Sequence, residues 1–250
     1  MGKRSYGEAC GIPRALDRVG ERWALMVVRE LLLGPKRFTD LREGLPHMSA
    51  DVLAQRLREL EENGIVERRI LPPPAASKVY ELTEWGRELE SVLIAVGRWG
   101  ARAPLGADEE PCMSLDSHVV SLQTLFDPEL AGDFAPLVEL RLGADVFALE
   151  VVDGRVGVGG GGASKSAMST TQAGPSTTAR GAASKPDIVI ATDPATLLGL
   201  AHRQIELADA LAAGDAEVTG DKRAARRFLR LFPLPEPAAC ADAVAAAKAE

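Results

Sequence analysis

The side chains best suited to a binding function lie on one face of a helix that we expect from residue 50 to residue 62. Leu53, Leu57 and Leu60 recur at spacings of three and four and form its apolar stripe. At 100° per residue, the opposite side carries the residues that could touch a base, namely Asp51, Gln55, Arg58 and Glu62, with Ala54 beside them. Glutamine can form paired hydrogen bonds with adenine and arginine with guanine, so this face is suited to reading DNA.

Phosphate contacts are expected on both sides of that helix. Ser49 and Ala50 stand at its N-terminus, where backbone N–H groups attract phosphate. The basic residues that could clamp the backbone are Lys36, Arg37, Arg68, Arg69 and Lys78. The alternative is an ordinary solvated polar face, which is the commoner role of residues opposite an apolar stripe.

The surrounding elements favour the DNA-reading interpretation. Apolar spacing predicts one or two helices over Ile12–Leu33, with a break possible at Gly20, and a short helix capped by Thr39 and ending at Gly44. After the helix at 50–62, the runs IVERRIL and KVYEL flank PPPAAS and predict a β-hairpin. A further helix is expected over Glu84–Arg102. This order is that of a winged helix-turn-helix, whose longer helix enters the major groove.

Residues 10–100 resemble the HxlR family of bacterial winged-helix regulators, which is similar to the wider MarR group. The most distinctive pieces are Cys10 with Pro13, GERW at 20–23, GPKRF at 34–38, and LRELEENGIVERR. Gly11 departs from the family, which usually has proline after the cysteine. The resemblance implies a homodimer on a pseudopalindromic operator, with dimer contacts from the helices of about 10–33 and 84–102.

The resemblance also draws attention to Cys10, because a cysteine at this position senses oxidation in some relatives. An inert thiol is the alternative, since Cys112 and Cys240 are expected in a linker and in the C-terminal tail. His47, His118 and His202 are isolated and predict no metal site. No nucleophile stands beside a base and no cofactor motif is found, so we expect neither an enzyme nor a bound cofactor.

The length of 250 residues favours two domains. We expect a winged helix-turn-helix over 1–104, a linker over 105–114, a second domain over 115–233 and a tail over 234–250. Residues 1–105 hold 17 Lys and Arg against 15 Asp and Glu, whereas residues 106–250 hold 12 against 21, so a polyanionic partner belongs to the first domain. No apolar run reaches the roughly 20 residues of a membrane span and no signal peptide is evident, so a cytoplasmic location without membrane contact is expected.

The second domain is expected to combine strands and helices, which makes the chain α+β. Residues 159–185 are dominated by Gly, Ala, Ser and Thr and predict a disordered loop. The flanking segments resemble sterol-carrier-protein-like domains, chiefly through IVIATDPATLLGLAHRQIELADALAAG and KRAARRFLRLFP. Such domains enclose an apolar tunnel, which six residues could line here: Leu197, Leu200, Ile205, Leu211, Phe228 and Phe232. Ordinary core packing is the alternative for these residues.

These patterns predict a homodimeric, sequence-specific transcriptional regulator that binds a double-stranded DNA operator. Binding could be modulated by a small hydrophobic ligand in the second domain. The alternative is a carrier of lipid-like molecules in which the winged helix serves only for dimerisation.

Overall fold

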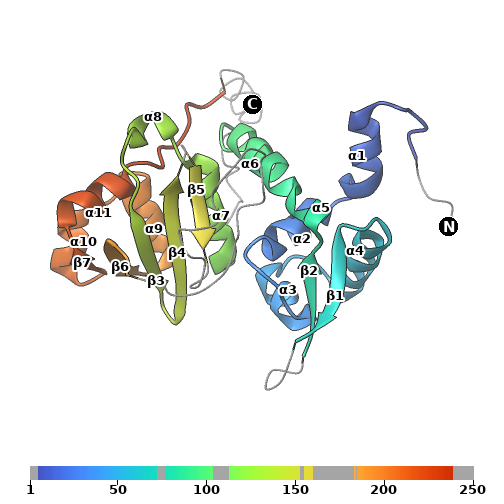
Figure 1. The fold of residues 1–250 in the computed structure, drawn as a ribbon, viewed down its shortest axis with the longest axis horizontal. Helices are drawn as coiled ribbons and strands as arrows, with labels where there is room; N and C mark the ends of the chain where they lie inside the picture. The colour runs from blue at the N-terminus through green and yellow to red at the C-terminus, as the bar shows by residue number, and fades with distance from the viewer. Residues whose placement is uncertain are drawn as a thin grey trace, which may run out of the picture. The chain divides into compact units, whose positions relative to one another are not determined.

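The computed structural model describes residues 5–71, 77–103, 113–152, 155–159, 183 and 185–238 (Figure 1). The chain divides into two compact units between Leu93 and Ile94, inside a helix and N-terminal to the boundary expected at residue 104. The expected hairpin tip, most of the expected linker and tail, and all of the expected disordered loop except residues 159, 183 and 185 lie outside the described residues. None of the described helices combines the length and apolarity needed to cross a bilayer.

The first unit is a winged helix-turn-helix. Its elements are α1 (Gly11–Val19), α2 (Ala24–Leu31), α3 (Phe38–Gly44), α4 (Ala50–Glu62), β1 (Val66–Ile70), β2 (Lys78–Leu82), α5 (Glu84–Arg87) and the start of α6 (Leu89–Gly100). The helical pattern before Gly34 forms two helices, and the break expected at Gly20 is confirmed: Gly20 caps the end of α1, and Trp23, with a left-handed φ of 77°, precedes α2. The helix expected over 84–102 is likewise divided, into α5 and α6.

Local capping determines where the central helices begin and end. The Ser49 hydroxyl accepts from the N–H of Val52 and caps α4, which stops before Gly64 at φ of 72°. The prediction that Thr39 caps this helix is wrong. Helix α3 begins at Phe38, so Arg37 is its N-cap residue, and the N–H of Arg37 donates to Asp40 Oδ2 at 3.0 Å.

The hairpin is held against the helices by backbone contacts. Strands β1 and β2 pair antiparallel, with Arg68 opposite Tyr80. The N–H of Lys36 donates to the Tyr80 carbonyl at 3.0 Å, and the N–H of Tyr80 donates back to the Lys36 carbonyl at 2.8 Å. Gly86 closes the other end of the hairpin, because a side chain there would overlap the carbonyl oxygen of Ile65.

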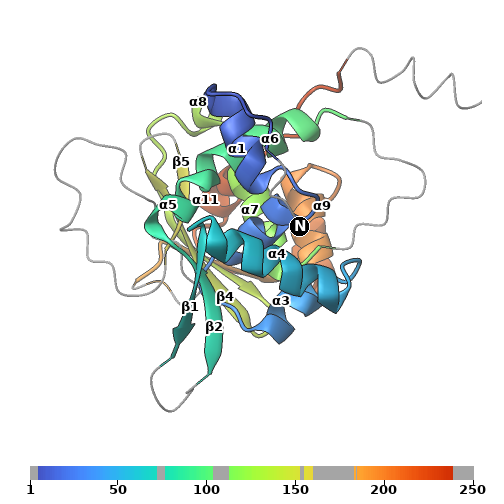
Figure 2. The same cartoon turned by 90° about the vertical axis from the view of Figure 1, so that its right-hand side faces the viewer.

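The second unit is built on a five-stranded sheet in the order β5-β4-β3-β6-β7. The strands are β3 (Leu137–Leu142), β4 (Asp145–Val152), β5 (Arg155–Gly159), β6 (Ile188–Thr192) and β7 (Ala216–Gly220). The helices are α7 (Leu115–Leu125), α8 (Pro128–Ala131), α9 (Pro194–Ala201), α10 (Leu207–Ala213) and α11 (Lys222–Leu229). Strands β3 and β6 pair parallel and the other neighbours antiparallel, so the sheet is mixed. In Figures 1 and 2 the helices α7 and α9 cover one face of this sheet.

Helix capping and a pair of hydrogen bonds from an arginine complete the second unit. Asp193 caps α9, and its hydrogen bonds with the Thr196 hydroxyl and backbone hold the pKa of that carboxyl below its ordinary value of 3.8. Arg98 of α6 donates to the carbonyls of Thr124 at 2.8 Å and Phe126 at 2.6 Å. The C-terminal half of α6 is therefore fastened to the end of α7.

The contact at Gly86 generates a test of the first unit. Gly86→Ala should lower its free energy of unfolding by about 1–3 kcal/mol, because the added methyl must displace the Ile65 backbone. Chemical denaturation followed by tryptophan fluorescence measures this change. Gly11→Ala is the control, since its Cβ would meet open space; an equal loss in both variants would contradict the packing account.

Candidate nucleic-acid interface

One side of α4 is solvent-exposed in the manner that the apolar spacing predicts. Leu53, Leu57 and Leu60 are at most 1% exposed. Ser49, Ala50, Asp51, Gln55 and Arg58 are exposed, and Ala54 is half-buried. We call these six residues the α4 face. Because the leucines anchor the other side, the helix cannot rotate to hide these groups without exposing its core.

The two side chains best able to read a base differ in their surroundings. Gln55 Nε2 donates to Glu59 Oε1 at 3.0 Å, so one of its amide protons is already engaged. Within the described part of the chain, Arg58 has no carboxylate within ion-pair distance. The Arg58 guanidinium therefore remains available for an external acceptor such as the O6 and N7 atoms of guanine.

Arg56 is a residue of this helix that sequence reasoning missed. It is 8% exposed and forms ion pairs with Glu59 in α4 and with Glu21 in the turn between α1 and α2, the latter at 3.6 Å. The pair fastens the helix to the preceding segment. The signal for it was the spacing of an arginine three residues before a glutamate, on the edge of the apolar stripe.

The wing presents three cations from its two strands. Arg68 pairs with Glu61 at 2.8 Å and stacks over the Tyr80 ring at 5.2 Å, while Arg69 pairs with Glu81 at 3.2 Å. Both arginine side chains remain 53% exposed, and Lys78 is exposed as well. The carboxylates reduce the net positive charge of the wing and hold the guanidinium groups in defined positions.

Lys36 is placed differently from the expectation of a surface phosphate clamp. It is 8% exposed, and its Nζ lies 2.7 Å from Oε2 of Glu30, which is fully buried and also pairs with Arg29. The ammonium group thus neutralises an internal carboxylate. Its neighbour Arg37 is exposed, as is Arg42 on α3, a further cation that sequence reasoning did not select.

Cys10 is exposed at the N-terminus of α1 and forms no side-chain cap. The other two cysteines lie outside the described residues. Within the described ranges, no group of three or more His, Cys, Asp or Glu side chains could hold a metal ion.

The six residues expected to line an apolar tunnel fall into two groups. Leu197, Leu200, Phe228 and Phe232 are buried, and the two phenylalanine rings pack edge to face with centroids 5.1 Å apart. Ile205 is 37% exposed, and Leu211 is half-buried. A hollow of about 20 Å³ adjoins Leu200 and Ile205, which is space for about one water molecule.

The comparisons with known proteins concern the first unit. Residues 18–104 match the family described as HxlR-like helix-turn-helix. The chain is 41% identical over 85 residues to the HTH-type transcriptional regulator YodB of Bacillus subtilis, covering 34% of this chain and 76% of YodB. It is 36% identical over 86 residues to the uncharacterized HTH-type transcriptional regulator YvaP of the same organism, covering 34% of this chain and 80% of YvaP.

Two solved structures are similar to part of this chain. The reduced form of YodB from B. subtilis shares 38% identity and covers 38% of this chain and 94% of its own, with a TM-score of 0.35. The redox regulator HypR in its oxidised form shares 32% identity and covers 39% of this chain and 100% of its own, with a TM-score of 0.36.

The internal pairing of Lys36 generates a prediction about stability. Lys36→Met should lower the free energy of unfolding of the first unit by about 2–4 kcal/mol, because buried Glu30 then loses the cation whose Nζ lies 2.7 Å from its Oε2. Arg37→Met, at the exposed neighbouring position, should change it by less than about 0.5 kcal/mol. Denaturant titration measures both. Adding Glu30→Leu to Lys36→Met should recover most of the loss, and the absence of recovery would argue against the ion pair as its cause.

Proposed function

Because the chain belongs to the HxlR-like helix-turn-helix family, we propose that it is a homodimeric transcriptional regulator whose α4 face reads a DNA operator. The observation that carries this proposal is the exposed, unpaired guanidinium of Arg58 on a helix whose opposite side is fully buried. An α-helix fits the major groove, and a bidentate arginine discriminates guanine from the other bases.

The remaining contacts follow from the placement of the cations. The N-terminus of α4 and the exposed Arg37 would bind phosphates at the edge of the groove. Arg68, Arg69 and Lys78 would bind phosphates from the wing. Lys36 is left out of this interface because its charge is satisfied internally by Glu30.

Exposed apolar side chains support a dimer. Along α6, Val92, Val96 and Trp99 recur at helical spacing and are 45%, 48% and 78% exposed. On α1, Ile12 and Leu16 are 72% and 43% exposed. Large apolar side chains grouped on a few helices are typical of surfaces that a partner covers, and a two-fold dimer would match a pseudopalindromic operator.

We further propose that the second unit is a sterol-carrier-like ligand-binding domain that modulates operator affinity. The mixed five-stranded sheet with helices on its face supports this assignment. Because the space beside Leu200 and Ile205 holds about one water, a hydrophobic ligand would have to displace a side chain, and half-exposed Ile205 is the one with room to move. Coupling would run through α6, which starts in the first unit and whose Arg98 is bonded to the end of α7.

Oxidation of Cys10 would be a second route of control. Its thiol is exposed at the start of α1, beside the apolar residues proposed to form the dimer. A change at this thiol would act on the spacing of the two reading helices.

The DNA proposal is tested by electrophoretic mobility shift on the region upstream of the chain's own gene, with competitor DNA and varied salt. Arg58→Ala should weaken specific binding by about 1–3 kcal/mol, because a base contact is lost, while the stability of the fold is unchanged. Arg87→Ala, at another exposed arginine, should leave binding unchanged. Weak DNA binding that salt abolishes and that Arg58→Ala does not change would contradict the proposal. It would favour the alternative, a carrier of lipid-like molecules whose winged helix serves only for dimerisation.

The dimer proposal is tested separately by sedimentation equilibrium. Ile12→Asp should raise the dimer dissociation constant by at least about tenfold, because a charge would be buried at the interface. Ile70→Asp is the matched control, since this isoleucine is 66% exposed but lies on the wing. If both variants and the unchanged chain have the same dimer dissociation constant, α1 is not part of the interface.

A further inference from the structure

The second unit carries a concentration of arginines around one hollow. The hollow has a volume of about 330 Å³, and five of its seven lining residues are arginines. The complete lining is Leu130, Arg203, Arg223, Arg226, Arg227, Arg230 and Leu231. We call this the arginine hollow.

Two separate segments build the arginine hollow. Arg223, Arg226 and Arg227 lie on α11, and Arg230 follows it directly. Arg226 and Arg227 are three and four residues after Arg223, and Arg230 is three and four residues after those two, so all four share one side of the helix. Arg203 comes from the turn after α9, where its backbone adopts a left-handed conformation with φ of 59°. Residues other than glycine rarely adopt this conformation, so the fold holds an arginine against a local preference here.

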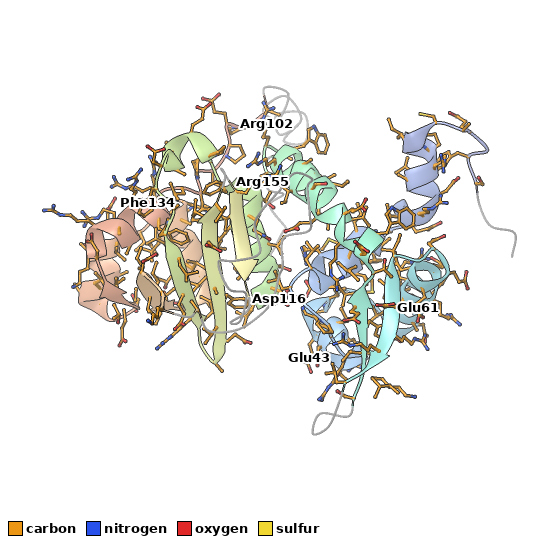
Figure 3. The ribbon with its side chains drawn as sticks, in the orientation of Figure 1. Glu43, Glu61, Arg102, Asp116, Phe134 and Arg155 are labelled. Carbon is orange, nitrogen blue, oxygen red and sulfur yellow. The ribbon has the colours of Figure 1, made fainter. Side chains whose placement is uncertain are left out.

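Most of these guanidinium groups have no protein partner of opposite charge. Within the described ranges, none of the five arginines forms an ion pair with a carboxylate. Arg227 is oriented by other contacts: it donates to the Ala131 carbonyl at 2.9 Å and lies 4.4 Å from the centre of the Phe134 ring. Phe134 is labelled in Figure 3. Carboxylates also lie near these cations: Glu206 borders the smaller adjoining hollow together with Arg203, Arg226 and Arg230, and Asp221 accepts from the backbone N–H of Arg223 at 2.7 Å.

The positive charge of these five arginines is opposite in sign to the net charge of residues 106–250. Residues 106–250 contain 12 Lys and Arg against 21 Asp and Glu, and five of those 12 line the arginine hollow. The five guanidinium groups repel one another, and none of them is ion-paired with a carboxylate in the described ranges. A bound external anion would therefore lower their electrostatic energy.

We propose that the arginine hollow binds the phosphate or diphosphate group of a small organic molecule. Guanidinium groups form paired hydrogen bonds with phosphate oxygens, and several cations match the multiple charge of phosphate better than the single charge of a carboxylate. Leu130 and Leu231 provide apolar wall for the organic part, and the volume lies at the lower end of the range of small-molecule sites. A nucleic acid is disfavoured because the acidic remainder of the unit would repel a long polyanion.

This site is independent of DNA reading by α4, so it can fail or succeed separately. The experiment is isothermal titration of the full chain with pyrophosphate and with a short-chain alkyl phosphate. Saturable binding is expected with a Kd of about 1 mM or lower. Arg226→Gln and Arg230→Gln should each weaken it by about tenfold or more, because each removes a charge-assisted bond. Glu206→Gln should strengthen it, since a nearby negative charge is removed.

The controls separate this site from other cations. Lys222→Gln removes a charge on α11 that does not line the hollow, and Arg58→Ala removes one from the α4 face; both should leave pyrophosphate binding unchanged. Circular dichroism checks that each variant is folded. Binding of the chain to vesicles that contain phosphatidic acid is measured in parallel. If the chain binds these vesicles and Arg226→Gln abolishes the binding, the phosphate group that the site recognises is that of a lipid.

Three results would overturn the proposal. The first is the absence of saturable binding of pyrophosphate, of the alkyl phosphate and of the vesicles. The second is binding that persists in both arginine variants, which would place it elsewhere. The third is a loss of operator DNA affinity in Arg226→Gln equal to that of Arg58→Ala, which would assign the arginines to the nucleic acid.

Discussion

Burial of Leu53, Leu57 and Leu60 is the constraint on which the proposed reading surface of the first unit depends. These side chains are excluded from solvent against α1, α2 and β1, so rotation of α4 about its axis would expose apolar area and is opposed by the hydrophobic effect. The Ser49 cap and the left-handed Gly64 limit the helix at its two ends, and Arg56 ties its edge to Glu21. The α4 face is therefore presented by a rigid element, as a surface that reads DNA requires.

The charged residues of the first unit divide into those that hold the fold and those that face solvent. Lys36 and Glu30 meet in the interior, and the backbone of Lys36 also joins the hairpin through Tyr80. One residue thus connects the turn after α2 with the wing, which explains why its charge is not available outside. On the wing, Glu61 and Glu81 hold Arg68 and Arg69 in position.

In the second unit the net charge and the charge around one hollow have opposite signs. It is acidic as a whole, yet α11 and the end of α9 bring five arginines to one hollow. Many of its apolar side chains form the core: Phe228 and Phe232 are fully buried, and the Phe232 ring packs edge to face with Phe228 and at a tilt against Phe126. The hollow of about 330 Å³ in the described part of this unit is lined by five arginines and two leucines.

Local patterns in the sequence determined the order of the helices and strands, the division into two units and the polar face of α4. Helical and strand periodicities and capping residues act over a few positions, so they can be read without knowledge of the fold. The tertiary structure decided which charges are internal, which strands are neighbours and which distant residues meet. The burial of Lys36 depends on Glu30 approaching it across a turn, the parallel pairing of β3 with β6 depends on a crossover, and the arginine hollow depends on α9 ending beside α11. Each of these joins positions that are apart along the chain, and their proximity is set by packing of the whole unit, which periodicity does not encode.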